Sequence, residues 1–459
     1  MPYGIRYIGL KGNESMKQIV PGNQALAALC GEQKKENRRY RLTKHCIQKV
    51  CEDGILLYHT LTGELLLLKD GEEIREQEDA LVSKWFAVPE AYDENRFADE
   101  IRTVYRMMRP QGGAKTVFTI LTTTDCNARC YYCYEMGIRR LPMTDETAHA
   151  AADYIARVSR GEKVRLRWFG GEPLYNRRAI DLICRDLKEK QIVFESSMIS
   201  NGYYLDRETV RDAVTEWQLR QVQITIDGTE KVYNRTKAYI DRDGSSPYER
   251  VMQNIRTALD AGIRVHIRLN MDAGNAGDLL HLTEDLEKRF QGCENLGVYV
   301  AIIHEFAGKI HAYRSLEQKE ADYFAIRERL KQSGLLRKGE DLPSAMRNAS
   351  CIADNDAGET ILPDGRVGRC EHFSESMITG DLYHEERDPD VTRKWKERLV
   401  VPACRDCALY PRCRRLAMCE WNRDGCDELE RRIDRIRTEE QMLKAYHDRK
   451  KEETKHETD

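Results

Sequence analysis

Residues 125–135 read Asp-Cys-Asn-Ala-Arg-Cys-Tyr-Tyr-Cys-Tyr-Glu, so three thiols, Cys126, Cys130 and Cys133, stand at C-x3-C-x2-C spacing. They directly follow a β-branched run that is typical of a strand. Three thiolates on one loop can hold three irons of a [4Fe-4S] cluster, whose metals prefer soft sulfur ligands. The remaining iron then stays open to a chelating ligand. A zinc loop without its fourth ligand is the alternative, and the nearest histidine is His149.

Strand-like and helix-like segments alternate from residue 115 onward. The β-branched runs predict strands at 117–123, 164–169, 192–199, 221–226, 264–269 and 297–302. Amphipathic stretches predict helices at 145–159, 178–190, 207–217, 248–261 and 278–290. This alternation implies an α/β fold with parallel strands and right-handed crossovers, either a doubly wound sheet or a barrel. Six units form a partial, TIM-like (β/α)6 barrel, with its chemistry on the loops after the strands.

The cysteine loop and the segment after the second predicted strand together resemble the radical S-adenosylmethionine (SAM) superfamily. The segment is Gly170-Gly171-Glu172, which matches the family's GGE motif. In that family the amino and carboxylate groups of SAM chelate the open iron. One electron from the cluster then cleaves SAM to methionine and a 5′-deoxyadenosyl radical, which abstracts hydrogen from the substrate. The resemblance therefore implies a [4Fe-4S] cluster on the three cysteines and SAM as cofactors.

The resemblance also assigns cofactor contacts to single positions. The expected SAM-binding residues are Tyr132, Gly170, Gly171, Glu172, Ser200, Asn201, Asp227, Lys237 and Asn270. By the family pattern, Tyr132 lies near the adenine, and Glu172 accepts a hydrogen bond from the SAM ammonium. The strand-end residues contact the ribose or the methionine part of SAM. Ordinary strand-end turns are the alternative for them. Lys237 stands where the family commonly has an arginine that pairs with the SAM carboxylate. A lysine is a point charge, so that pairing is expected to be looser or to pass to Arg235.

Seven further cysteines resemble the family's SPASM extension, which carries two auxiliary [4Fe-4S] clusters. The family's ligation pattern gives Cys404, Cys407, Cys413 and Cys426 to one complete cluster, and Cys351, Cys370 and Cys419 to the other. The second cluster then has an open iron or a fourth ligand that the sequence hides. The gap between Cys413 and Cys419 is five residues, where the family usually has three. A zinc ribbon over 404–426 is the alternative on spacing alone.

Glu371 directly follows Cys370, where the sulfatase-maturing branch of the family has an aspartate that accepts a substrate proton. We expect Glu371 to be a catalytic base. The alternative is a surface carboxylate or a partner of Arg369. Further polar candidates, which are more often structural when they stand alone, are His304, Glu305, His311 and His372.

Composition excludes some function classes. The 459 residues include 74 Lys and Arg against 77 Asp and Glu, a net charge of −3, which favours neither nucleic acid nor membrane as a partner. No apolar run approaches the 18 residues of a membrane-spanning helix, and the first residues lack the apolar core of a signal peptide. We therefore expect a cytoplasmic protein, whose 15 cysteines are not disulfides.

Patterning predicts five segments. They are an N-terminal winged-helix-like α+β module (1–112), the radical SAM core (113–310), a helical bridge (311–350), the SPASM domain (351–426) and a C-terminal helix with a charged tail (427–459). Expected strands at 40–50 and 55–59, joined at Asp53-Gly54, mark the first module. It resembles the peptide-recognition (RRE-like) module of peptide-modifying enzymes; a capping domain without a partner is the alternative.

The combined resemblance predicts a radical SAM/SPASM oxidoreductase with three [4Fe-4S] clusters. Its expected reaction is hydrogen abstraction from a ribosomally made precursor peptide (RiPP maturation), followed by a thioether or carbon-carbon crosslink. The N-terminal module would bind the leader sequence by strand addition, and flavodoxin or ferredoxin would supply electrons. One alternative is an anaerobic sulfatase-maturing enzyme that forms formylglycine. Another is a non-catalytic iron-sulfur or zinc scaffold that binds peptides.

Overall fold

The computed structural model describes residues 16–24, 26–27, 36, 39–70, 78–107, 113–241, 243–303, 310–337, 342, 352–372, 377–384, 386–396, 402–411 and 426–458. Contacts divide the chain into two compact units. Unit 1 comprises 1–109, 339–350 and 398–459, and unit 2 comprises 110–338 and 351–397. The five-part division expected from the sequence stays a prediction.

Unit 2 is built on a mostly parallel sheet with the strand order β12-β11-β10-β9-β8-β7-β13-β14-β15. The strands are β7 (Val117–Thr123), β8 (Val164–Gly170), β9 (Phe194–Ser200), β10 (Leu219–Ile226), β11 (Arg264–Met271), β12 (Leu296–Ile302), β13 (Gly358–Ile361), β14 (Arg366–Gly368) and β15 (Ile378–Asp381). Pairing is parallel from β12 to β13 and antiparallel from β13 to β15. The predicted α/β fold is confirmed, and all six expected strands form.

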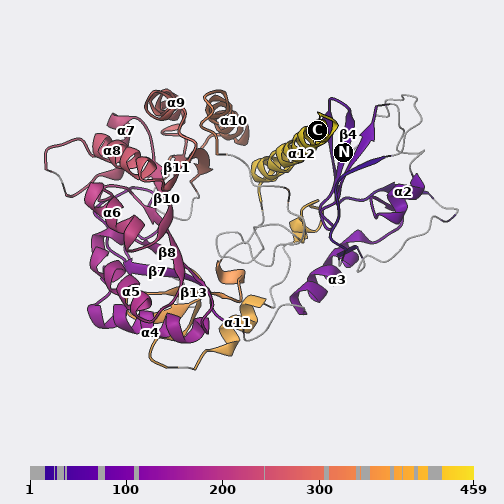
Figure 1. The fold of residues 1–459 in the computed structure, drawn as a ribbon. Helices are drawn as coiled ribbons and strands as arrows, with labels where there is room; N and C mark the ends of the chain where they lie inside the picture. The colour runs from indigo at the N-terminus through magenta and orange to yellow at the C-terminus, as the bar shows by residue number, and fades with distance from the viewer. Residues whose placement is uncertain are drawn as a thin grey trace. The chain divides into compact units, whose positions relative to one another are not determined.

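Helices between the strands cover one face of this sheet (Figure 1). They are α4 (Asp145–Ser159), α5 (Arg177–Glu189), α6 (Arg207–Thr215), α7 (Glu230–Lys237), α8 (Pro247–Asp260) and α9 (Ala276–Phe290), followed by α10 (Leu316–Gln332). Several begin with a side-chain cap, as where Thr144 accepts from the Thr147 N–H and Asp206 from the Thr209 N–H. The sequence did not predict the short helix α7, which carries Lys237 as its last residue.

The two faces of the parallel sheet differ in polarity. On β10, Ile224 is fully buried and shares contacts around Gly202 with Val251 of α8, so this side faces the helices. The next residue, Gln223, is only half-buried and accepts from the Tyr299 hydroxyl of β12 at 2.7 Å. Because successive side chains on a strand point to opposite faces, the face away from the helices is polar.

Unit 1 contains an antiparallel sheet with the order β1-β5-β4-β3. Its strands are β1 (Lys17–Val20), β3 (Cys46–Cys51), β4 (Gly54–His59) and β5 (Leu65–Lys69). Gly54 follows the tight turn with φ +140°, and a Cβ there would lie 2.1 Å from the Leu68 carbonyl oxygen, so only glycine fits. The single strand expected over 40–50 is wrong. A turn closed by the Cys46 N–H and the Thr43 carbonyl separates β3 from β2 (Tyr40–Leu42), which pairs with β6 (Ala87–Pro89).

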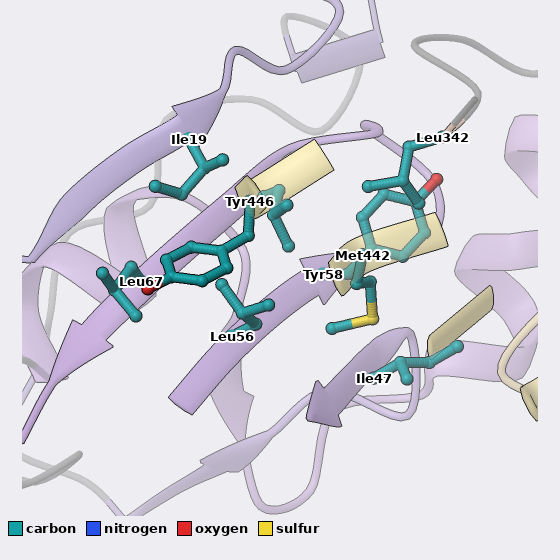
Figure 2. Close-up of a cluster of buried hydrophobic side chains, with 9 residues drawn as sticks. Ile19, Ile47, Leu56, Tyr58, Leu67, Leu342, Met442 and Tyr446 are labelled. Carbon is teal, nitrogen blue, oxygen red and sulfur yellow. The ribbon is translucent and has the colours of Figure 1, made fainter. Parts of the chain in front are cut away.

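Apolar side chains cover both faces of the unit 1 sheet. The C-terminal helix α12 (Glu428–Thr458) packs Met442 and Tyr446 on one face, against a cluster that includes Ile19, Leu56 and Leu67 (Figure 2). On the other face, Leu81 and Val82 of α2 (Glu78–Ser83), with Phe86, contact Leu57 and Leu66. Among the strands that the structure describes, β1 and β3 are the edges of this sheet.

The remaining described elements are the helices α3 (Glu94–Met107) in unit 1 and α11 (Pro389–Lys396) in unit 2, and the short 3-10 turns η1 (Pro173–Asn176), η2 (Ile352–Asp354) and η4 (Pro402–Cys404). No helix in the described part of the chain is long and apolar enough to cross a membrane.

Candidate active site

The expected SAM-binding residues gather at one edge of the parallel sheet. The cysteine loop follows β7, the Gly-Gly-Glu segment follows β8, Asn201 follows β9, and Asp227 follows β10. Asn270 is the penultimate residue of β11. Because the carboxyl ends of parallel strands meet at the same edge, residues far apart in the chain are brought together there.

The two glycines allow close contact with the start of the cysteine loop. Gly170 has φ +124°, and a Cβ on it would lie 2.1 Å from the Thr123 carbonyl oxygen. A Cβ on Gly171 would lie 2.3 Å from the Asp125 carbonyl oxygen. The backbone N–H groups of Gly171 and Glu172 donate to the same two carbonyls at 3.0 and 2.9 Å. Any side chain at either glycine would displace the loop that carries the thiols.

Glu172 joins the ends of β8 and β9. Its buried carboxylate accepts from the Ser200 hydroxyl at 2.8 Å, the Asn201 N–H at 2.7 Å and the Leu174 N–H at 3.1 Å. Burial raises the pKa of Glu172 to about 7, although these donors act in the opposite direction. The carboxylate is therefore engaged by the protein itself, and its expected contact with the SAM ammonium stays a prediction.

Two N–H donors point at the Cys126 sulfur. The Ala128 N–H lies 3.3 Å from Cys126 Sγ, and the Asn201 side-chain amide lies 3.7 Å from it. The same amide donates to Asn127 Oδ1 at 2.7 Å, which fixes its orientation. Donors of this kind stabilise a thiolate and orient a metal ligand.

Tyr132, Asp227 and Lys237 form a buried polar group beside the thiols. The Tyr132 hydroxyl donates to the Asp227 carboxylate at 2.8 and 2.9 Å, and Lys237 Nζ lies 3.1 Å from that hydroxyl. Lys237 Nζ is also 3.0 Å from Asp227 Oδ2, and the two side chains are 4% and 0% exposed. Burial lowers the pKa of Lys237, but the charge of the Asp227 carboxylate, together with smaller contributions from neighbouring groups, raises it by a larger amount. The pKa of Lys237 therefore lies well above its usual value. Lys237 is thus a charged lysine whose partner is Asp227.

The three thiols of the cysteine loop have raised pKa values in the chain without a bound group. Burial raises the pKa of Cys133 to about 11, and it also raises the pKa values of Cys126 and Cys130. At Cys126 and Cys133, neighbouring thiols make smaller contributions in the same direction. Among the described residues, no group of three or more His, Cys, Asp or Glu is placed to hold one metal ion. Thiolates that bind separate irons of a cube need not converge on one point.

Two unsatisfied polar atoms at this edge also fit a bound ligand. Asn127 Nδ2 and Asn270 Oδ1 are buried and have no hydrogen-bond partner among the described residues. A buried polar group without a partner is costly, so such atoms point to a ligand at the site. The residues present therefore fit a [4Fe-4S] cluster with SAM.

Sequence reasoning missed Asp272, which lies one residue beyond β11. Its carboxylate accepts from the Tyr131 hydroxyl at 2.7 Å and from the His311 N–H at 3.1 Å. The Tyr131 and His311 rings are in edge contact, with their centroids 5.3 Å apart. The signal that selected Asp227, a carboxylate at the end of a parallel strand, would also have found Asp272.

The Cys370 segment lies beside the end of the cysteine loop. The His372 ring meets the Tyr134 ring edge-on at 4.9 Å, and the His372 N–H lies 3.4 Å from Cys370 Sγ. Burial raises the pKa of Tyr134, and the Glu135 and Glu371 charges add to this shift. Glu371, the expected base, is therefore close to the loop. Arg369, its alternative partner, donates to the Ala353 carbonyl at 2.7 and 3.0 Å.

The structure describes the C-terminal cysteines only in part. Cys404 and Cys407 share a turn in which the Cys407 N–H donates to the Cys404 carbonyl at 3.1 Å. Cys426 precedes α12, and Cys370 follows β14. The expected residues Cys351, Cys413, Cys419, His304 and Glu305 lie outside the described residues.

Comparisons with known proteins agree with this geometry. Residues 120–286 match the family model of the radical SAM superfamily. Native anSMEcpe with bound AdoMet and Kp18Cys peptide has a TM-score of 0.52 at 13% identity, covering 72% of this chain and 99% of that chain. Histidine-tagged anSMEcpe with bound AdoMet has a TM-score of 0.51 at 15% identity, with coverages of 73% and 97%. Streptococcus suis SuiB bound to precursor peptide SuiA has a TM-score of 0.48 at 12% identity, with coverages of 82% and 95%.

Among the curated proteins, none matches this sequence significantly. At these identities the solved structures show a shared fold, whereas the family model covers the segment that carries the cysteine loop and the strand-edge residues. Residues 120–286 therefore form a radical SAM domain.

Proposed function

We propose that this radical SAM enzyme acts on a ribosomally made precursor peptide and installs a thioether or carbon-carbon crosslink. The observation that carries the proposal is the strand edge that holds the three loop thiols. There the Asn201 amide lies 3.7 Å from Cys126 Sγ, and Tyr132, Asp227 and Lys237 form a buried polar group. The peptide substrate is supported by the fold shared with anSMEcpe, which was crystallised with AdoMet and a peptide.

Cys126, Cys130 and Cys133 would hold the cluster, and the strand-edge residues would hold SAM. When bound, these groups supply the one-electron chemistry that starts hydrogen abstraction. The protein contributes the N–H donors at Cys126 and a dry site, since Asp227 and Lys237 are almost fully buried. Because Asp227 already neutralises Lys237, we assign the SAM carboxylate to Arg235, an exposed residue in the last turn of α7.

Glu371 would take up the proton that the oxidised substrate loses. Its charge reaches Tyr134 at the end of the cysteine loop, so the carboxylate lies on the same side of unit 2 as the thiols. The proposal also includes two auxiliary clusters on the C-terminal cysteines and a flavodoxin or ferredoxin as reductant.

The N-terminal module would bind the leader of the peptide. Because α12 and α2 cover the faces of its sheet, an added strand would pair with an edge. The β3 edge carries the exposed residue Val50, which is 73% accessible.

Sulfatase maturation is the second candidate function. The observation that favours it is the fold shared with anSMEcpe, a sulfatase maturase, of which 99% is covered. This function requires Glu371 and a Cys or Ser that becomes formylglycine. It does not require the N-terminal module to bind a leader.

Anaerobic reconstitution with iron, sulfide, dithionite and SAM tests the shared chemistry. We expect 5′-deoxyadenosine from the native chain and none from Cys130→Ala, measured by mass spectrometry. A native chain that is loaded with clusters and still forms no 5′-deoxyadenosine would refute enzymatic function and favour a binding scaffold.

Co-expression with a short peptide encoded beside the gene separates the two candidate reactions. A crosslinked cysteine retains its sulfur and the peptide loses two hydrogens. A cysteine converted to formylglycine loses its sulfur, whereas a serine converted to formylglycine loses two hydrogens; in both cases the product carries an aldehyde that a hydrazide reagent labels. Aldehyde labelling would refute the crosslinking proposal and establish the second candidate.

A further inference from the structure

The turn that carries Cys404 and Cys407 is attached to the N-terminal sheet. We call residues 402–411 the cysteine turn. The Thr60 hydroxyl, at the end of β4, donates to the Ala408 carbonyl at 2.5 Å, and Lys44 Nζ donates to the Arg405 carbonyl. All of these residues belong to unit 1, which contains both ranges, 1–109 and 398–459.

His45 makes a second contact with the same carbonyl. Its side chain is 1% exposed, and Nδ1 lies 3.3 Å from the Ala408 oxygen. Because a carbonyl only accepts, Nδ1 carries the proton and donates. Nε2 is then a buried acceptor with no partner among the described residues. A buried acceptor without a partner is costly and calls for a structural explanation.

A third group of contacts holds the far end of the turn. The Tyr410 hydroxyl donates to Asp99 of α3 at 2.6 Å, and the Arg405 guanidinium pairs with the same carboxylate at 3.3 Å. Arg102 Nη1 lies 3.5 Å from the Tyr410 hydroxyl. Ala408 and Leu409 pack against the apolar cluster shown in Figure 2. Residues on both sides of Cys407 are thus fixed by side chains of the N-terminal module.

We propose that the N-terminal module holds an auxiliary cluster in place, with Thr60, His45 and Asp99 as positioning residues for the turn that carries Cys404 and Cys407. This inference rests on the proposed function, in which these cysteines bind iron. The physical reason is that a cluster needs its thiolates prearranged, and partners around the ligands control how firmly the metal is held. The module then has a task besides peptide recognition.

The test uses the full chain with Cys126→Ala, Cys130→Ala and Cys133→Ala, which removes the three thiols of the cysteine loop and keeps all seven auxiliary cysteines. Into this parent we place Thr60→Val, which keeps the shape and removes the hydroxyl, and Tyr410→Phe, which removes the bond to Asp99. Thr103→Val is the matched control, because Thr103 is exposed and its hydroxyl donates only within its own helix, to the Asp99 carbonyl. Thr60→Ser, which retains a hydroxyl, is the conservative variant.

After anaerobic reconstitution, we measure iron and sulfide per chain, the electron paramagnetic resonance spectrum after dithionite, and the rate of iron loss to a chelator. We expect Thr60→Val and Tyr410→Phe to lose iron about 10-fold faster than the parent and to alter the spectrum. Thr103→Val should match the parent, and Thr60→Ser should restore its behaviour.

The outcomes separate this inference from the proposed function. If the parent loads iron and both variants match it in spectrum and iron loss, the inference is wrong, even if the variants melt at a lower temperature. If the parent binds no iron, or binds zinc instead, the auxiliary clusters of the proposed function are refuted, and the inference is refuted with them.

Discussion

Lys237 Nζ and Asp227 Oδ2 lie 3.0 Å apart at the edge of the parallel sheet, with side chains that are 4% and 0% exposed. Lys237, which stands where the radical SAM family commonly has an arginine, forms a buried ion pair with Asp227. The Tyr132 hydroxyl contacts both residues. A buried pair stabilises little compared with apolar residues, but an orphaned partner is strongly destabilising.

Lys237→Met should therefore lower the free energy of unfolding of the cluster-free chain by about 3–5 kcal/mol, because Asp227 is left buried without its cation. Denaturant unfolding measures this change. The double variant Lys237→Met with Asp227→Asn should recover part of the loss, since no charge is then orphaned. An unchanged unfolding free energy for the single variant would mean that the pair is not buried as described.

Arg235→Gln should weaken SAM binding, because its exposed guanidinium is the cation that we assign to the SAM carboxylate. Loss of a charge-assisted hydrogen bond of about 1.5–3 kcal/mol corresponds to roughly 10- to 100-fold in Kd. Calorimetric titration of SAM into the reconstituted enzyme measures the effect. Lys231→Gln, an exposed cation in the same helix, is the matched control. If both variants bind SAM with equal affinity, Arg235 does not pair with the SAM carboxylate, and Lys237 is the expected partner.

Gly171→Ala tests the close contact between the Gly-Gly-Glu segment and the cysteine loop. The new Cβ would lie 2.3 Å from the Asp125 carbonyl oxygen, so the loop must shift and the thiols lose their arrangement. We expect a marked loss of the SAM-cluster iron with an unchanged circular dichroism spectrum. Gly113→Ala is the control, because a Cβ there has no neighbour within 4 Å. Full iron content in Gly171→Ala would show that the cysteine loop keeps its arrangement without a glycine at this position of the Gly-Gly-Glu segment.

How much the sequence could predict depends on the range of the interactions. The strands and the loop thiols follow from local patterns, and parallel order then implies that residues such as Asn201 and Asp227 share an edge. The ion pair of Lys237 could not be predicted in this way, because helix α7 is short and is not evident from the sequence pattern. The Lys237 ammonium meets Asp227, ten positions earlier, only once the chain folds back.

The attachment of the cysteine turn to the N-terminal sheet joins residues that are far apart in the sequence. Thr60 and Ala408 are 348 residues apart, and neither belongs to a recognisable motif. The sequence predicts the C-terminal helix α12 with a charged tail, but it does not indicate that Met442 and Tyr446 of this helix cover the unit 1 sheet.

Met442→Ala should destabilise unit 1, because this fully buried side chain lies in the cluster on the face of the sheet. Truncation of a buried methionine typically costs about 2–5 kcal/mol. Lys444→Ala, two residues further along α12 and exposed, is the matched control. Thermal unfolding of the full chain should show a lower first transition for Met442→Ala alone. Equal melting of both variants would mean that α12 does not cover the sheet in solution.

His45 predicts a specific dependence of stability on pH. Burial, together with the charge of Lys44, lowers the pKa of His45 to about 3, although its bond to the Ala408 carbonyl acts in the opposite direction. Below the ordinary histidine pKa of about 6.5, the unfolded chain binds a proton that the folded chain does not, so stability falls as pH falls from 6.5 toward 3. Between pH 6.5 and pH 5 this contributes roughly 2 kcal/mol of lost stability.

His45→Gln should remove that part of the acid sensitivity, because glutamine does not titrate. Unfolding free energies of the cluster-free chain at pH 7 and pH 5 give the comparison, and we expect the variant to lose about 2 kcal/mol less than the native chain. His281→Gln, at an exposed position of α9, controls for the loss of a histidine as such. If His45→Gln and the native chain lose the same stability on acidification, His45 is already charged in the folded state, and its neutral contact with the cysteine turn is refuted.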